Sequence, residues 1–133
     1  MKAVFADAFY FVACLNRVDQ HHQKAAWFAL QNQRPIATTT WVLTEVADAF
    51  AASAARNRIA GFVAALEGDG NTKIIRATEI LFHRGLERYS ARPDKSWTLT
   101  DCISFVVMED EGITEALTGD QHFMQAGFDL LLK

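Results

Sequence analysis

The chain has 133 residues, half of them hydrophobic, and a formal net charge of −3 at pH 7. This length suits one domain with a sizeable core, so we expect a single domain over residues 1–133. The sequence has no run of about 18 apolar residues, which argues against a membrane span. The acidic balance argues against binding nucleic acid by charge alone, but not against an enzyme that recruits cations through carboxylates.

The first 17 residues, MKAVFADAFYFVACLNR, are rich in apolar side chains and superficially resemble a signal peptide. Asp7 interrupts the apolar run and no small-residue cleavage site follows, so we interpret residues 2–6 as the first strand of a soluble domain. Cys14 and Cys102 lie in apolar runs without zinc-ligand spacing, which is typical of reduced core cysteines in a cytoplasmic protein. We therefore expect a cytoplasmic location.

After the first strand, short apolar runs alternate with segments of helical periodicity. Helices are predicted over about 21–33, 39–55, 58–66, 78–89, 98–111 and 122–126, and further strands over 36–38, 73–76, 113–117 and 128–132. Thr39 or Thr40 can cap the second of these helices, and Gly112 ends the fifth. The alternation predicts a three-layer α/β/α, Rossmann-like domain with a mostly parallel sheet of four to five strands.

Four acidic residues fall where such a sheet binds ligands, at the carboxyl ends of its strands. Asp7 directly follows the first strand, and Asp120 lies three residues beyond the fourth. Asp101 lies in the first turn of the helix that begins at Thr98, and Glu45 lies about one turn into the helix after the second strand. We therefore expect all four at one edge of the sheet.

Four carboxylates in one crevice repel each other strongly unless cations neutralise them. Oxygen ligands alone select hard ions such as Mg²⁺ or Mn²⁺. These ions can activate a water, align it with a phosphate and stabilise the leaving oxygen. The pattern therefore predicts phosphodiester hydrolysis.

Each of these acids also has an ordinary structural interpretation. Asp7 is a candidate helix cap or turn residue, and Asp101 with Thr98 resembles a capping box. Glu45 on a helix is typical of a solvated surface residue, and Asp120 in Thr-Gly-Asp is typical of a turn. From spacing alone these alternatives stay open.

Two segments near the carboxyl end resemble the third and fourth acidic motifs of PIN domains. Residues 96–108, SWTLTDCISFVVM, carry Asp101, and residues 112–128, GITEALTGDQHFMQAGF, carry Asp120. The strand before Asp7 fits the first motif, and Thr44-Glu45-Val46 fits the second. Over nearly its whole length the chain is similar to the toxin ribonucleases of VapBC-type toxin–antitoxin pairs.

The resemblance implies a single PIN domain over residues 1–133, a Mg²⁺- or Mn²⁺-dependent endoribonuclease that acts on RNA, a homodimer and an antitoxin partner. It also implies that Asp7, Glu45, Asp101 and Asp120 form the metal-binding and catalytic set, with Asp7 and Asp101 as direct ligands. In one respect this sequence departs from the family, because the first motif usually continues with a hydroxyl residue or Asn, and Ala8 stands here. We expect Thr118 or Thr39 to supply the missing hydrogen bond.

Several other side chains are weaker candidates. His122 is a candidate ligand or base, although a supporting or packing role is favoured. Trp41 and Trp97 are candidates for base stacking, and we favour packing under the helices. Three arginines at helical spacing are candidates for binding RNA phosphates, and a solvated charged face is favoured: Arg84, Arg88 and Arg92. Asp94 and Lys95, in the loop before Thr98, are candidates for contact with the substrate, and pairing is favoured.

The main alternative is a PIN-like module that binds RNA with weak or no catalysis. A haloacid dehalogenase-type phosphatase needs Asp-x-Asp after its first strand, and Phe9 stands at the second position. A receiver domain needs a phosphorylatable Asp on its middle strand, which the sequence lacks. Neither a P-loop nor a GxGxxG motif occurs.

Overall fold

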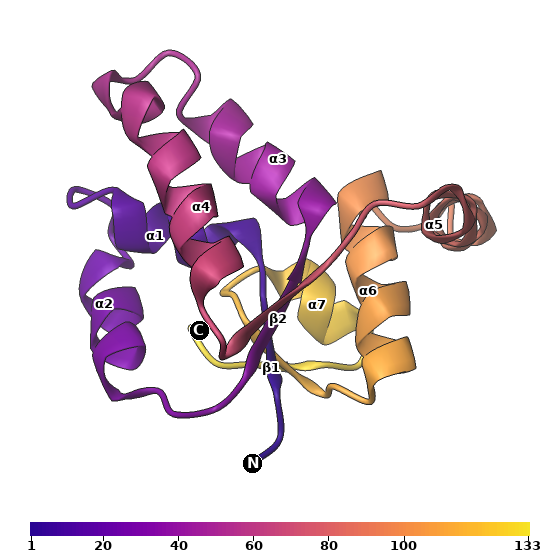
Figure 1. Cartoon of the computed structure of the whole chain (residues 1–133). Helices are drawn as coiled ribbons and strands as arrows, with labels where there is room; N and C mark the ends of the chain where they lie inside the picture. Colours follow the sequence, from indigo (N-terminus) through magenta and orange to yellow (C-terminus); the bar gives the residue numbers. More distant parts are fainter.

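Five parallel strands form the centre of the computed structural model, which describes residues 1–133 (Figure 1). The strands are β1 Val4–Ala6, β2 Ile36–Thr39, β3 Thr72–Ile75, β4 Glu115–Leu117 and β5 Asp129–Leu130. Their order in the sheet is β3-β2-β1-β4-β5, with every neighbouring pair parallel. Phe5 of β1 pairs with Ala37 on one side and Ala116 on the other, so the first strand is central. The predicted parallel sheet is confirmed.

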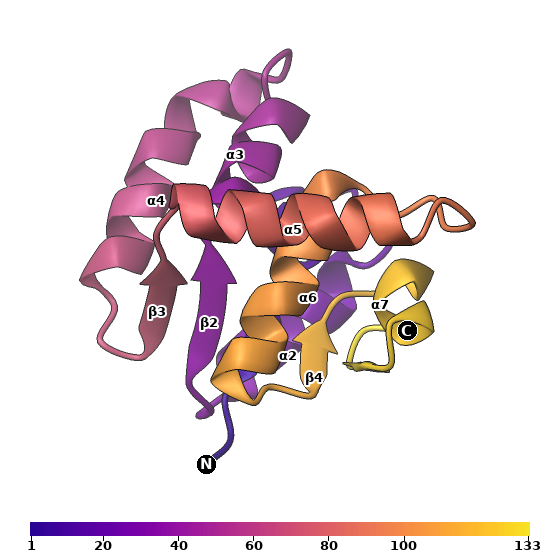
Figure 2. The same cartoon turned by 90° about the vertical axis from the view of Figure 1, so that its right-hand side faces the viewer.

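Helices cover both faces of this sheet. They are α1 Ala8–Leu15, α2 His22–Gln31, α3 Thr40–Ala49, the 3₁₀ helix η1 Ala54–Arg58, α4 Ile59–Gly68, α5 Glu79–Ala91, α6 Leu99–Glu111 and α7 Gln121–Gln125. Helix α1 packs on α2 and α3, whereas α6 lies on the other side with α5 outside it (Figures 1 and 2). The arrangement is the predicted three-layer α/β/α sandwich. No helix has the length and apolar character that crossing a membrane requires.

Helix α6 is buried over most of its length, which fixes the position of its first turn. Phe105 of α6 meets Phe123 of α7 edge to face, with ring centroids 5.1 Å apart. Trp97, just before α6, also packs edge to face on Phe105 and donates its indole N–H to Gln125 Oε1 at 3.1 Å. Because Trp97 is only 6% exposed, the packing interpretation of this residue is confirmed.

The structure corrects two expectations about the helices. Helix α1, over Ala8–Leu15, was not expected, because its residues are apolar on all sides and show little periodicity. The helix predicted to reach residue 55 ends at Ala49, and Ser53 then caps the separate helix η1 through the Ala55 N–H. Thr39 caps α3 by accepting the Val42 N–H at 3.1 Å, one of the two caps predicted.

The two cysteines are free thiols. Cys102 is fully buried in α6, and Cys14 is half-buried in α1. Burial raises the pKa of both thiols, which makes them poor nucleophiles. They are core residues, as expected.

Candidate active site

Asp7 stands at the N-cap position of α1, directly after the central strand. Its backbone is extended, but its side chain makes no capping hydrogen bond. Instead, Oδ2 accepts a hydrogen bond from Thr118 Oγ1 at 3.0 Å. Asp7 is 5% exposed and Thr118 is fully buried. A carboxylate buried in this way does not serve the helix, so the capping interpretation of Asp7 loses its basis.

Asp101 caps α6 and lies near enough to Asp7 for the two charges to interact. Thr98 Oγ1 accepts the Asp101 N–H at 3.0 Å, and the Thr98 N–H donates to Asp101 Oδ2 at 3.1 Å, so the capping box is present. The same Oδ2 accepts a hydrogen bond from His122 Nδ1 at 2.8 Å. Both donors use one oxygen, which leaves Oδ1 of this buried carboxylate without a protein donor.

Asp120 is the N-cap of α7. Its Oδ1 accepts the His122 N–H at 2.9 Å, which leaves Oδ2 without a protein donor. The backbone N–H of Asp120 donates to Thr118 Oγ1 at 3.1 Å. The Thr118 hydroxyl therefore joins Asp120 to Asp7, because it accepts from one and donates to the other. This double role was not foreseen, although the turn-forming sequence Thr-Gly-Asp was a signal for it.

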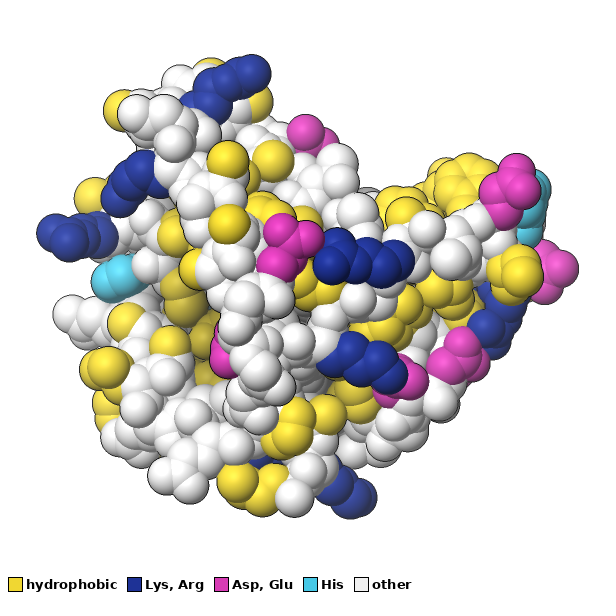
Figure 3. Space-filling view, viewed as in Figure 1, with side chains coloured by type: hydrophobic (Ala, Val, Ile, Leu, Met, Phe, Trp, Pro, Cys, Tyr) yellow, Lys and Arg dark blue, Asp and Glu magenta, His cyan; other side chains and the backbone are white.

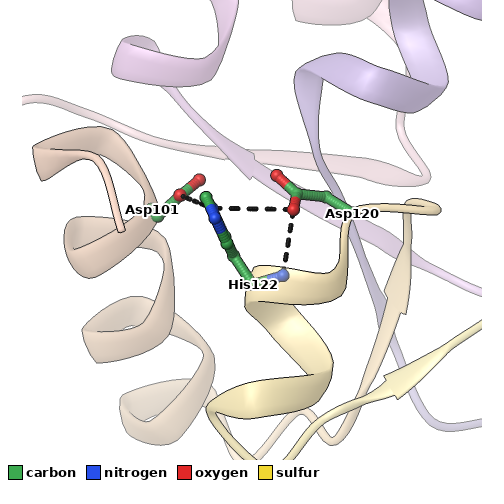
Figure 4. Close-up of side chains that lie close together, drawn as sticks. All are labelled: Asp101, Asp120 and His122. Atoms are coloured by element: carbon green, nitrogen blue, oxygen red, sulfur yellow. Dashed lines mark hydrogen bonds and ion pairs between the residues drawn. The ribbon is translucent and has the colours of Figure 1, made fainter. Parts of the chain in front are cut away.

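His122 lies between two of the carboxylates, as Figure 4 shows. Its Nδ1 is 2.8 Å from Asp101 Oδ2 and 3.6 Å from Asp120 Oδ1. The potential ligand atoms of Asp101, Asp120 and His122 all lie within 4.8 Å of one another. Because Nδ1 meets a carboxylate oxygen at hydrogen-bond distance, it carries the proton there. This hydrogen bond favours the expected role of His122 as a residue that positions Asp101.

Glu45 is half-buried in α3 and outside this tight group. Its carboxylate has no hydrogen-bond partner in the protein. Burial, together with the charges of Asp7, Asp101 and Asp120, raises the pKa of Glu45 to about 7. Glu45 therefore lies close enough to the other three acids for their charges to act on it.

The four carboxylates form a cluster of negative charge. The pKa of Asp7 is raised to about 7, chiefly by burial and also by the charges of Asp101 and Asp120, against the opposing effect of the Thr118 hydrogen bond. No lysine or arginine forms an ion pair with any of the four acids, and His122 is their only basic contact. The free oxygens of Asp101 and Asp120 and the all-carboxylate surroundings fit a hard divalent cation.

The arginines at helical spacing are not free cations, and none pairs with the four acids. Each pairs with a carboxylate: Arg84 with Asp110, Arg88 with Glu109 and Arg92 with Asp94. The interpretation as a solvated charged face is confirmed. The predicted pair of Asp94 with Lys95 is wrong, because the Arg92 guanidinium binds Asp94 in a bidentate manner and lowers the pKa of that carboxyl to about 2.

These acids lie beyond the carboxyl ends of parallel strands in a three-layer α/β/α fold. Among solved structures, the toxin VapC20 of Mycobacterium tuberculosis, described as cleaving the sarcin–ricin loop, superposes with a TM-score of 0.85. The two chains are 24% identical, and the match covers 94% of this chain and 95% of that one. No protein-family model matches the chain. No curated protein matches it significantly in sequence. The likeness establishes the shared fold.

Proposed function

We propose that this protein is a metal-dependent endoribonuclease. The observation that carries the proposal is the clustering of Asp7, Asp101 and Asp120, with two oxygens lacking any protein donor and no lysine or arginine paired with them. A protein that only needed stable helices would not bury Asp7 beside two further acids, since burial without cations is costly.

The residues present suit Mg²⁺ or Mn²⁺. Asp101 through Oδ1, Asp120 through Oδ2 and Asp7 would hold the ion, which when bound supplies an activated water and neutralises charge on the phosphate. Thr118 orients the Asp7 carboxylate, and His122 orients that of Asp101, so each hydrogen bond holds one oxygen of its carboxylate in place. Glu45, half-buried near the other acids and without a hydrogen-bond partner in the protein, is suited to accept the proton of the attacking water.

RNA is the proposed substrate. The support is the fold shared with VapC20, a toxin described as cleaving the sarcin–ricin loop. Attack by water, rather than by the 2′-hydroxyl of the RNA, predicts products with linear phosphate ends and no cyclic phosphate. A metal-independent ribonuclease that uses the 2′-hydroxyl would leave the cyclic ends, so the product termini distinguish the two mechanisms.

The cleavage test compares Mn²⁺ with EDTA on purified protein. We expect wild type to cut RNA in Mn²⁺ and not in EDTA, and Asp7→Asn to be inactive in both. Asp129→Asn is the matched control, because Asp129 is exposed on β5 and its side chain makes no hydrogen bond. If neither Mg²⁺ nor Mn²⁺ supports cutting and Asp7→Asn behaves like wild type, the nuclease proposal fails. RNA binding without cleavage would then favour the non-catalytic RNA-binding alternative.

We further propose that the protein is the toxin of a toxin–antitoxin pair. Because the four acids have no lysine or arginine partner, an inhibitor can neutralise them by inserting a basic side chain. Co-expression with the product of an adjacent small gene tests for the partner through co-purification. A structure of that complex with no Arg or Lys near Asp7 and Asp101 would contradict this mode of inhibition. The expected homodimer is tested by light scattering of the purified chain.

A further inference from the structure

Three arginines of the chain have no carboxylate partner, and all three lie at one corner. Arg17 follows α1, and Arg56 and Arg58 belong to η1. The other five arginines are ion-paired: Arg34 with Glu115, Arg76 with Glu67, Arg84 with Asp110, Arg88 with Glu109 and Arg92 with Asp94. The three arginines at this corner can therefore bind an anion, whereas the other five are neutralised by carboxylates of the protein.

This corner contains a pocket of about 380 Å³. Arg17 and Arg58 line it together with the polar side chains of Asn16 and Ser53. Arg56 lies beside it and donates from Nη1 to the Ala51 carbonyl at 2.8 Å. A carbonyl holds a guanidinium in place without neutralising its charge. In Figure 3, basic side chains stand along the outer edge of the lobe of α1, α3 and α4, whereas acidic and basic side chains interleave over α5.

The pocket is linked to the acids by two helices. Helix α1 begins directly after Asp7 and ends at Leu15, and α3 carries Glu45 and ends at Ala49; both end residues line the pocket. The eight residues of α1 rise about 12 Å. Stacked nucleotides rise about 3.4 Å each, so the pocket lies roughly three to four nucleotides from the acid cluster.

RNA binding to this chain presents an electrostatic problem. The net charge is −3, and four clustered acids repel the phosphates next to the cut bond. Cations away from the cluster would add affinity for the phosphates that a metal ion at the acids does not reach. Unpaired guanidiniums suit this purpose, because their planar donors match phosphate oxygens in a bidentate manner.

We propose that Arg17 and Arg58, with Arg56 beside them, form a phosphate-binding subsite for single-stranded RNA. The proposal rests on the proposed RNA substrate of the acid cluster. In this arrangement one RNA strand reaches from the acids to the arginine pocket, where its backbone binds. The subsite supplies affinity and positioning, whereas the acids supply the chemistry.

The first test measures binding without cleavage. A labelled twelve-nucleotide single-stranded RNA is titrated against Asp101→Asn and against the triple variant Asp101→Asn, Arg17→Ala, Arg58→Ala. We expect the arginine substitutions to weaken binding about tenfold and to reduce the salt slope by about 1.4, or about 0.7 per lost phosphate contact. The matched control replaces the ion-paired Arg84 and Arg88 by Ala in the same background, and its RNA binding should match that of Asp101→Asn. The proposed subsite would be contradicted if both pairs of arginine substitutions weakened RNA binding equally, or if replacing Arg17 and Arg58 did not weaken it.

The second test uses substrate length in the cleaving protein. The loss of kcat/KM in Arg17→Ala, Arg58→Ala should grow from a dinucleotide to the twelve-nucleotide RNA, since only the longer strand reaches the pocket. A loss that is equal at both lengths would overturn the proposed placement. If wild type binds but cuts no RNA, and the arginine substitutions still weaken that binding, the nuclease proposal fails and the subsite stands. If wild type cuts RNA and the substitutions leave binding intact, the subsite alone fails.

Discussion

The Thr118 hydroxyl donates to Asp7 Oδ2 at 3.0 Å, across 111 residues of sequence. Asp7 follows β1 and Thr118 follows the neighbouring strand β4, so the parallel pairing of these strands brings them together. The PIN-like first motif leads one to expect a hydroxyl or Asn directly after the Asp, where this chain has Ala8. Thr118 donates a hydrogen bond to the Asp7 carboxylate from another segment. It is one of the two threonines, with Thr39, that were expected from the sequence to supply this bond.

Thr118→Val tests this contact, because it removes the hydroxyl and keeps the side-chain shape. We expect the Mn²⁺ concentration for half-maximal cleavage to rise about tenfold or more, since a hydrogen bond to a charged group contributes about 1.5–3 kcal/mol. The matched control is Thr38→Val, because Thr38 is also buried and donates to the Ala6 carbonyl at 2.8 Å. Thr38→Val should lose stability but keep its metal requirement. The same shift in metal requirement for both variants would contradict a specific role for Thr118.

The raised pKa of Asp7 predicts how the metal-free protein responds to pH. In the folded chain this pKa is about 7, above the ordinary value of 3.8, so the folded state holds the proton more tightly than the unfolded state. The free energy of unfolding should therefore fall as pH rises from about 4 to about 7 and stay lower above that range. Asp7→Asn has no ionisable group at this position, so its stability should not change with pH for this reason.

Thermal melts in EDTA check this prediction. At pH 8 the Asp7→Asn variant should be more stable than wild type, by on the order of a few kcal/mol at about 1.4 kcal/mol per pKa unit. The difference in stability between Asp7→Asn and wild type should become smaller as the pH is lowered toward 4. If Asp7→Asn is less stable than wild type at pH 8, the ionised Asp7 carboxylate does not destabilise the folded protein. Saturating Mn²⁺ should reverse the order at pH 8, because only wild type keeps the full ligand set.

His122 offers a test of positioning at Asp101. His122→Ala removes the donor to Asp101 Oδ2, and we expect the cleavage rate to fall about tenfold, in the range that supporting partners of metal ligands contribute. His122→Asn retains an N–H donor close to the place of Nδ1 and should recover part of the loss. Single-turnover rates at saturating Mn²⁺ make the comparison. Equal rates for wild type and His122→Ala would remove His122 from the site.

The packing of α5 on α6 gives a prediction about stability. A Cβ at Gly85 of α5 would lie 2.3 Å from Ile103 Cγ1 and 3.2 Å from the Ile103 Cα. Gly85→Ala should therefore destabilise the fold by about 1–3 kcal/mol through overpacking. Gly61→Ala in α4 is the control, because a Cβ there meets nothing within 4 Å, and it should stabilise by up to about 1 kcal/mol. Urea unfolding of both variants measures the change in the free energy of unfolding. A change of the same sign in Gly85→Ala and Gly61→Ala would contradict the close approach of α5 to α6.

Much of the sheet and the position of the acids follow from local sequence. Short apolar runs mark the strands, and the rule that ligands meet the carboxyl ends of parallel strands places Asp7, Glu45, Asp101 and Asp120 at one edge. Helix α1 could not be predicted in the same way. Its residues, Ala8–Leu15, are buried or half-buried in contact with the sheet, α2 and α3, so they carry little of the periodicity that marks a surface helix.

The contacts within the site depend on tertiary structure. The capping box of Thr98 and Asp101 is local and was recognised as an alternative role for Asp101. The structure shows that one oxygen serves the cap and His122 together, so the two roles are compatible. The absence of a capping bond at Asp7 depends on Thr118, which is distant in sequence. No local pattern determines which oxygen each donor selects.

The most direct measurement is the cleavage of a pool of cellular RNAs with mapping of the cut ends, for wild type beside Asp101→Asn. In Mn²⁺ we predict defined internal cuts with linear phosphate ends for wild type, and loss of those cuts in Asp101→Asn. Asp129→Asn should give the wild-type cut map. Cuts that persist unchanged in Asp101→Asn or in EDTA, or that carry cyclic phosphates, would contradict a metal-dependent ribonuclease built on these carboxylates.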